Sequence, residues 1–141
     1  GKTVTAICPM TQPEKLPAVV VRPAYMPGHW EAKLAEFAPT LRVHTIDHGK
    51  PYSLVQLKGD RRRRADLWTT LPDVIVVTYH MLRGWADVLA GLVRYAVFDE
   101  VQQLRHDGTQ IYRAARHLAA HASWRMALSA TPIYNYGAEF F

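Results

Sequence analysis

The stretch Asp73-Val74-Ile75-Val76-Val77-Thr78-Tyr79 decides the fold class. Its β-branched residues form the strongest strand signal in the sequence. An uninterrupted apolar run of this kind is typical of a parallel sheet, because helices cover both faces of such a sheet. Further strands are expected on either side of it, at residues 18–21, 41–46, 95–98 and 124–128.

Segments with helical periodicity alternate with these strands. Helices are expected at residues 27–38, 60–71, 81–92 and 109–122, with a loop at 47–59. In the first helix, Trp30, Leu34 and Phe37 lie at the spacing of one apolar face. Strands that alternate with helices of about a dozen residues predict crossover connections. The expected fold is therefore α/β, with a mostly parallel central sheet and helices on both faces.

Composition excludes several classes of protein. The chain has 141 residues, of which 49% are hydrophobic, so it fits one globular domain and is not disordered as a whole. No stretch approaches the roughly 18 apolar residues of a membrane helix, so no membrane partner is expected. A single cysteine excludes an internal disulfide and fits an intracellular, reducing compartment. The net charge of +5 favours an anionic partner.

Polar residues that follow the strands are the candidates for chemistry, because open parallel sheets bind ligands at the carboxyl ends of their strands. Asp99 and Glu100 come directly after the strand at 95–98 and are flanked by apolar residues. This pattern favours a metal-holding Asp beside a water-activating Glu. The structural alternative is an acidic first turn of a helix.

A phosphate site is indicated by Gly1-Lys2-Thr3, which matches the last three residues of the phosphate loop G-x-x-x-x-G-K-[ST]. In that loop the backbone N–H groups cradle phosphates, the lysine reaches the terminal phosphates and the hydroxyl ligates Mg²⁺. The tripeptide alone is a weak signal, so its weight depends on the other motifs of the chain.

Those motifs resemble the superfamily 2 helicases and translocases, in their Swi/Snf-like and restriction-enzyme-like branch, of the DEAD/DEAH type. In the family's order, the matching segments are G-K-T at 1–3, V-V-V-R-P-A-Y-M-P-G-H-W-E at 19–31, D-V-I-V-V-T-Y-H-M-L at 73–82, V-F-D-E-V-Q at 97–102 and L-S-A-T-P-I at 128–133. The resemblance spans essentially the whole chain. It implies a three-layer RecA-like fold and the first ATPase lobe of an ATP-driven nucleic-acid motor.

The resemblance also implies roles for individual residues. Lys2, Asp99 and Glu100 would be catalytic, with Glu100 activating water, and Thr3 and Asp99 would hold Mg²⁺. The expected nucleotide-binding residues are Gly1, Lys2, Thr3 and Gln102, the coupling residues are Ser129, Ala130 and Thr131, and the nucleic-acid contacts are Arg22, Pro23, Thr78 and Tyr79. The implied cofactors are ATP and Mg²⁺. The implied partners are a nucleic acid, with double-stranded DNA expected, and a second RecA-like lobe of the same parent chain.

Two positions depart from the family pattern. Gln102 stands where the family usually has His or Asp, and Arg22 stands where this branch often has Cys. The matched motifs begin inside the phosphate loop and end just past the coupling motif. Residues 1–141 are therefore expected to be one partial lobe that hydrolyses ATP at a near-background rate in isolation.

Other functions remain open from the sequence. One is a hydrolysis-deficient RecA-like module that binds nucleic acid or a partner protein, and another is a phosphate-loop kinase of small metabolites. The run Arg61–Arg64 fits a nucleic-acid patch and a solvated helix face equally well. His117 and His121 have a metal-like spacing, but no third ligand is evident, which favours structural or solvated histidines.

Overall fold

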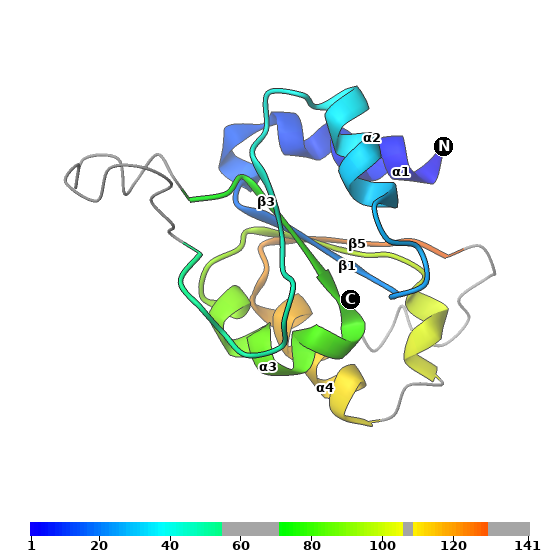
Figure 1. Ribbon diagram of the computed structural model, residues 1–141, viewed down its shortest axis with the longest axis vertical. Helices are drawn as coiled ribbons and strands as arrows, with labels where there is room; N and C mark the ends of the chain where they lie inside the picture. The colour runs from blue at the N-terminus through cyan, green and yellow to red at the C-terminus, as the bar shows by residue number, and fades with distance from the viewer. Residues whose placement is uncertain (55–70, 106–108, 130–141) are drawn as a thin grey trace.

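A computed structural model describes residues 1–54, 71–105 and 109–129 of the chain (Figure 1). These residues form a five-stranded sheet in the order β2-β3-β1-β4-β5, and every neighbouring pair is parallel. The strands are β1 (Ala18–Arg22), β2 (Val43–Thr45), β3 (Val74–Thr78), β4 (Tyr95–Phe98) and β5 (Trp124–Ala127). The prediction of a parallel α/β fold is confirmed.

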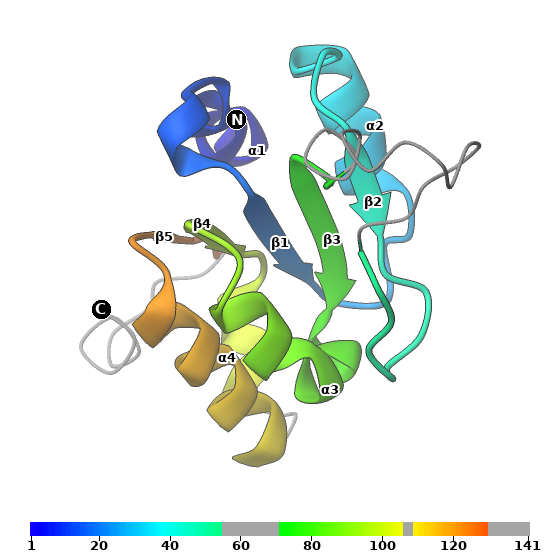
Figure 2. The ribbon, with the colours of Figure 1, turned by 90° about the vertical axis from the view of Figure 1, so that its left-hand side faces the viewer.

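Helices cover both faces of the sheet, as predicted (Figure 2). One face carries α1 (Lys2–Ile7) and α2 (His29–Phe37), and the other carries α3 (Tyr79–Ala90) and α4 (Thr109–His121). Short 3₁₀ turns complete the described elements: η1 (Cys8–Thr11), η2 (Pro13–Lys15) and η4 (Val101–Arg105). Within the described ranges, no helix has the length and apolar character needed to cross a membrane.

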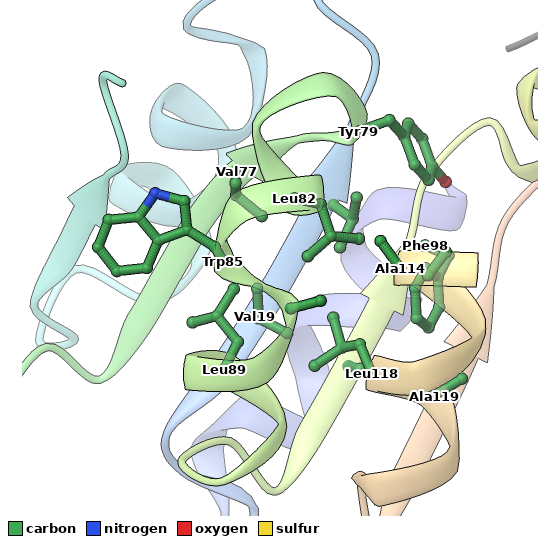
Figure 3. Packing of buried hydrophobic residues seen from close by; sticks show 14 of the residues in the cluster. Val19, Val77, Tyr79, Leu82, Trp85, Leu89, Phe98, Ala114, Leu118 and Ala119 are labelled. Carbon is green, nitrogen blue, oxygen red and sulfur yellow. The ribbon is translucent and has the colours of Figure 1, made fainter. Parts of the chain in front are cut away.

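The larger core lies between the sheet and the pair α3 and α4 (Figure 3). Leu82, Trp85 and Leu89 of α3 are fully buried there. The facing side of α4 is built largely from alanines around Leu118, so the two helices can approach closely. Burial of each large apolar side chain contributes roughly 1.5–3 kcal/mol to the free energy of unfolding.

The second core lies under α1 and α2, where Trp30 and Leu34 are buried against β1, β3 and β4. Two details of the predicted helix 27–38 are wrong. The helix begins after Gly28, whose φ of 81° is a left-handed conformation that glycine adopts without strain. Phe37 is 43% exposed, because the helix ends there and its ring packs near the Lys33 ammonium instead of the core.

The remaining differences concern boundaries and position. The strand predicted at 41–46 is shortened to β2, because only Val43–Thr45 pairs with β3. The helix predicted at 60–71, with Arg61–Arg64, lies outside the described residues except for its last position. Ala130 and Thr131 also lie outside them.

Parallel pairing brings the carboxyl ends of the strands to one edge of the sheet. Arg22 pairs with Thr78, and Phe98 lies between Val21 and Ala127 in neighbouring strands. The connections that leave β1 and β4 run in opposite directions, toward β2 and β5 respectively. A crevice for ligands is expected at such a reversal. The residues that follow these strands form the candidate site.

Candidate functional site

Asp99 is held by three elements at the end of β4. Its backbone N–H donates to the Val21 carbonyl oxygen of β1 over 2.8 Å. The Tyr79 hydroxyl of α3 donates to the Asp99 carbonyl oxygen over 2.6 Å. The indole Nε1 of Trp30, in α2, donates to Asp99 Oδ2 over 2.8 Å. Both the backbone and the carboxylate of Asp99 are therefore fixed by partners distant in sequence.

Glu100 has a φ of 48°, which makes it the one non-glycine residue of the described chain in the left-handed region. A side chain in this region costs of order 1–3 kcal/mol, and such residues concentrate at functional sites. The turn is held by the Gln103 backbone N–H, which donates to the Glu100 carbonyl oxygen over 2.9 Å. The half-buried carboxylate of Glu100 accepts a hydrogen bond from the Gln102 amide.

A chain of hydrogen bonds joins Glu100 to the first residues of the protein. The Ser129 hydroxyl donates to Gln102 Oε1 over 2.7 Å, while Gln102 Nε2 donates to the Glu100 carboxylate. The Lys2 ammonium donates to the Ser129 carbonyl oxygen. We call Lys2, Ser129, Gln102 and Glu100 the polar relay. It connects the start of α1 with the ends of β4 and β5.

Gln102 is chemically suited to the middle of the polar relay. An amide donates and accepts at the same time, so it can bond a carboxylate on one side and a hydroxyl on the other. An ionised Asp only accepts, so it cannot donate to Glu100. The backbone supports the contact, since Val101 N–H donates to the Leu128 carbonyl oxygen over 2.9 Å. Gln102, which departs from the family pattern, thus bridges the ends of β4 and β5.

The four residues predicted to contact nucleic acid lie together at the ends of β1 and β3, and all are buried. Thr78 Oγ1 accepts the Met81 backbone N–H over 3.2 Å and so caps α3, while the Tyr79 hydroxyl is bonded to Asp99. Arg22 is 8% exposed, and its Nη1 donates to the Pro23 carbonyl oxygen over 3.0 Å. Its Nε is buried without a hydrogen-bond partner among the described residues.

A hollow of about 350 Å³ lies beside these residues. Its lining comes from the β1–α2 loop, the start of α3, η4 and α4: Pro23, Ala24, Tyr25, Tyr79, His80, Gln103 and Ile111. Desolvation, followed by the negative charges of Glu100 and Asp99, raises the pKa of the Tyr25 hydroxyl, and a hydrogen bond with Gln103 opposes the shift. Tyr25, His80 and Gln103 are not among the predicted site residues, although Tyr25 and His80 lie inside the matching motifs and Gln103 adjoins one.

The two predicted metal-binding residues, Thr3 and Asp99, carry oxygen atoms of the kind that Mg²⁺ prefers. Thr3 lies half-buried in the first turn of α1, beside Lys2, and Asp99 supplies a carboxylate. Mg²⁺ prefers oxygen ligands and is commonly held by one or two carboxylates together with substrate phosphates and water. No group of three His, Cys, Asp or Glu side chains suited to a metal occurs in the part of the chain that the structure describes.

The two histidines with metal-like spacing have other partners. His121 Nδ1 lies 2.9 Å from the His117 carbonyl oxygen, and His117 Nε2 lies 3.1 Å from Asp87 Oδ1. Gly1, predicted to bind nucleotide, is exposed at the start of α1, where its carbonyl oxygen accepts the Thr5 backbone N–H over 3.2 Å.

Comparison with known proteins identifies the family. The family model described as the SNF2-related domain matches residues 1–141. The chain belongs to the SNF2-related domain family. It is therefore a Swi/Snf-like first lobe of the superfamily 2 helicases, as its motifs predicted, and an ATPase/helicase domain of the SNF2 type.

Solved structures agree with this family. The SNF2-related domain resembles the Sulfolobus solfataricus SWI2/SNF2 ATPase core in complex with dsDNA, with a TM-score of 0.70 and 26% identity over 100% of this chain and 27% of that chain. It also resembles the Sulfolobus solfataricus SWI2/SNF2 ATPase core domain, with a TM-score of 0.59 and 30% identity over 85% of this chain and 22% of that chain. The RecA-like fold is confirmed by the first of these structures.

Curated relatives are much longer than this chain. The SNF2-related domain is 27% identical to the Schizosaccharomyces pombe TATA-binding protein-associated factor mot1, over 85% of the chain and 6% of the relative. It is 25% identical to an uncharacterized ATP-dependent helicase of Mycoplasma pneumoniae, over 96% of the chain and 12% of the relative. The match thus covers a small part of each relative.

Proposed function

We propose that this SNF2-related domain binds Mg-ATP and couples its hydrolysis to movement on DNA, as the first lobe of a helicase or translocase. The polar relay from Lys2 to Glu100 is the observation that carries this proposal. It joins the residue expected to bind phosphate to the residue expected to activate water. Residues 1–141 form one RecA-like lobe in this proposal, and a second lobe of the same parent completes the motor.

Lys2 binds the β- and γ-phosphates, with Gly1 and Gln102 as further nucleotide contacts. Thr3 and Asp99 hold Mg²⁺, which when bound neutralises the negative charge of the phosphates. The Lys2 ammonium donates to the Ser129 carbonyl oxygen, so phosphate binding exchanges a neutral acceptor for a charged one. If the ammonium gave up the Ser129 carbonyl for a phosphate oxygen, nucleotide binding would free Ser129 at the end of β5, which would be the first step of coupling.

Glu100 orients the attacking water. Phosphoryl transfer depends on positioning and on charge stabilisation, so a carboxylate with a fixed backbone and a fixed hydrogen-bond partner suits this task. Gln102 supplies that partner. Because Gln102 is also bonded to Ser129, a shift of β5 relative to β4 moves the hydrogen bond on Glu100. Ala130 and Thr131 follow Ser129 in the coupling segment.

DNA lies along the edge formed by Arg22, Pro23, Thr78 and Tyr79. The solved relative in complex with dsDNA supports double-stranded DNA as the partner. Arg22 would turn its buried guanidinium outward to reach DNA, because a guanidinium bonds phosphate oxygens well and its Nε has no hydrogen-bond partner among the described residues. Contacts to phosphates position a protein without reading the base sequence, so binding is expected to be sequence-tolerant and salt-dependent. The setting is intracellular, and the isolated chain is expected to hydrolyse ATP at a near-background rate.

The test is ATP hydrolysis by the full-length gene product that contains these residues, with and without double-stranded DNA. Lys2→Ala is expected to abolish hydrolysis, because it removes the phosphate-binding ammonium. Lys33→Ala is the matched control, since Lys33 is a partly exposed lysine paired with Glu36 in α2. Retained turnover in Lys2→Ala would refute the proposal. DNA binding without nucleotide dependence in the wild type would instead favour a hydrolysis-deficient binding module.

A further inference from the structure

We propose that Trp30 and Tyr79 are positioning residues for the Asp99–Glu100 pair. Trp30 fixes the carboxylate of Asp99 for the metal, and Tyr79 fixes the peptide that sets the conformation of Glu100. This inference rests on the proposed function, and it gives Tyr79 a task different from contact with nucleic acid. Both residues act through Asp99 and neither touches the reacting atoms.

The evidence for Trp30 is the bond between its indole Nε1 and Asp99 Oδ2, which measures 2.8 Å. Trp30 is 1% exposed and packs in the core beneath α2, so its ring has little freedom to turn. A rigid donor bound to one carboxylate oxygen restricts rotation of the whole carboxylate. Carboxylates that ligate metals are commonly held by such outer hydrogen bonds, whose loss costs 10–100-fold in metal affinity or activity.

The evidence for Tyr79 is the bond between its hydroxyl and the Asp99 carbonyl oxygen, which measures 2.6 Å. That carbonyl belongs to the peptide unit that precedes Glu100. The φ of 48° at Glu100 is the rotation about the bond between this peptide and the Glu100 Cα. A donor that holds the carbonyl therefore opposes relaxation of Glu100 out of the left-handed region. Figure 3 shows Tyr79 at the margin of the core, with its oxygen on the side away from Leu82 and nearest to Phe98, the residue before Asp99.

A purely structural role is the competing explanation, because buried Trp and Tyr side chains usually find a hydrogen-bond partner. The chain contains a second buried Trp and a second buried Tyr, which serve as controls that separate a structural role from a positioning role. Trp85 is fully buried and its Nε1 donates to the His48 carbonyl oxygen over 2.9 Å. Tyr95 is 2% exposed and its hydroxyl donates to the Ala6 carbonyl oxygen over 2.9 Å. Neither bond involves Asp99 or Glu100.

The first experiment measures metal dependence in the full-length gene product. Binding of a non-hydrolysable ATP analogue is titrated against Mn²⁺ in the wild type, Trp30→Phe and the control Trp85→Phe. Trp30→Phe is expected to raise the Mn²⁺ concentration for half-maximal binding by roughly 10–100-fold, while Trp85→Phe leaves it at the wild-type value. Equal Mn²⁺ dependence of the two variants would overturn the role of Trp30.

An isosteric replacement of Trp30 separates the loss of the indole N–H from the loss of core packing. Site-specific incorporation of β-(3-benzothienyl)alanine at position 30 substitutes sulfur for the indole N–H and keeps the ring volume. The same rise in the Mn²⁺ requirement is expected, although the core remains filled. A wild-type Mn²⁺ titration in this protein would show that the N–H has no positioning role.

The second experiment separates turnover from binding. Tyr79→Phe is expected to lower kcat by roughly tenfold or more, with the Mn²⁺ requirement and the KM for ATP unchanged. Tyr95→Phe is the control and is expected to keep the wild-type kcat. An unchanged kcat at saturating DNA, together with weaker DNA binding, would assign Tyr79 to the nucleic-acid track and overturn this role.

Measurements on the wild type separate failure of the proposed function from failure of the positioning roles. If the wild-type protein neither binds the metal–nucleotide complex nor hydrolyses ATP, the proposed function itself fails. If the wild type does both and the Trp30 and Tyr79 variants behave as their controls do, the positioning roles fail and the proposed function stands.

Discussion

The indole Nε1 of Trp30 lies 2.8 Å from Asp99 Oδ2, which joins residues 69 positions apart in the sequence. Trp30 stands on α2 on one face of the sheet, whereas Tyr79, which holds the Asp99 carbonyl oxygen, begins α3 on the other face. Asp99, at the end of β4, therefore accepts hydrogen bonds from both helical layers. This arrangement makes the site an integral part of the folded core.

Gln102 offers a direct test of the polar relay. In Gln102→Glu the amide donor to Glu100 becomes a second carboxylate, so attraction is replaced by repulsion. Loss of a hydrogen bond to a charged group is worth roughly 1.5–3 kcal/mol, so DNA-stimulated ATP hydrolysis is expected to fall by about 10–100-fold. Gln110→Glu, at an exposed position of α4, is the control. Wild-type hydrolysis in Gln102→Glu would show that the relay does not serve turnover.

Gly84 is a position where alanine is expected to destabilise a helix. Alanine normally stabilises a helix by about 1 kcal/mol relative to glycine. At Gly84, however, an added Cβ would overlap the backbone carbonyl oxygen of Gly49, which leaves no room for it. Gly84→Ala is expected to lower the free energy of unfolding by roughly 1–3 kcal/mol in chemical denaturation.

The control is Gly91→Ala, because a Cβ at Gly91 would meet no atom nearer than 3.8 Å. Its free energy of unfolding is expected to change by less than about 0.5 kcal/mol. A stabilising effect of Gly84→Ala would mean that the loop at Gly49 does not rest on α3.

Leu89 and Val88 are neighbours in α3 with opposite environments. Leu89 is fully buried in the larger core, and Val88 is 42% exposed. Leu89→Ala is expected to lower the free energy of unfolding by roughly 2–5 kcal/mol, and Val88→Ala to change it by less than about 0.5 kcal/mol. Urea denaturation measures both. Similar losses at the two positions would contradict the orientation of α3 against the sheet.

Because the Tyr95 hydroxyl is buried, the free energy of unfolding is expected to fall at alkaline pH. Burial, with a smaller contribution from Cys8, raises the pKa of Tyr95 from 10.0 to about 12. The folded state therefore holds this proton more tightly than the unfolded state does. The contribution of the neutral Tyr95 hydroxyl to the free energy of unfolding is fully present below pH 10 and is lost as the pH rises toward 12. Over this range the free energy of unfolding falls by up to about 1.4 kcal/mol per pH unit.

Tyr95→Phe removes this titration, so its free energy of unfolding should fall less steeply than that of the wild type above pH 10. Denaturation at several pH values between 9 and 12 measures the two slopes. Parallel slopes would indicate that the hydroxyl of Tyr95 is not protected by the fold.

Strands β1 and β3 could be predicted from the sequence because they are short, β-branched runs beside prolines, with Pro17 and Pro23 next to β1 and Pro72 before β3. Val74–Thr78 and Tyr95–Phe98 lie where the apolar runs predict them. Boundaries that depend on a tertiary contact or a backbone conformation were harder to predict. Gly28 sets the start of α2 through a positive φ, and β2 extends only as far as β3 pairs with it.

The candidate site was predictable in its residue types but not in its connections. The acidic pair and the resemblance selected Asp99 and Glu100, whereas the left-handed φ of Glu100 has no signature in the sequence. The bond between Lys2 and Ser129 spans 127 positions, which no local pattern can indicate. Tyr79 was selected as a nucleic-acid contact, and that role stays a prediction beside its bond to Asp99.

The most direct test of the central claim is single-turnover ATP hydrolysis by Glu100→Gln in the full-length gene product. The substitution keeps the size of the side chain and removes the carboxylate that orients water. Bound ATP is expected to remain at the wild-type level while its hydrolysis falls to background, and Glu36→Gln, at an exposed glutamate of α2, is expected to hydrolyse normally. Hydrolysis at the wild-type rate in Glu100→Gln would contradict the account.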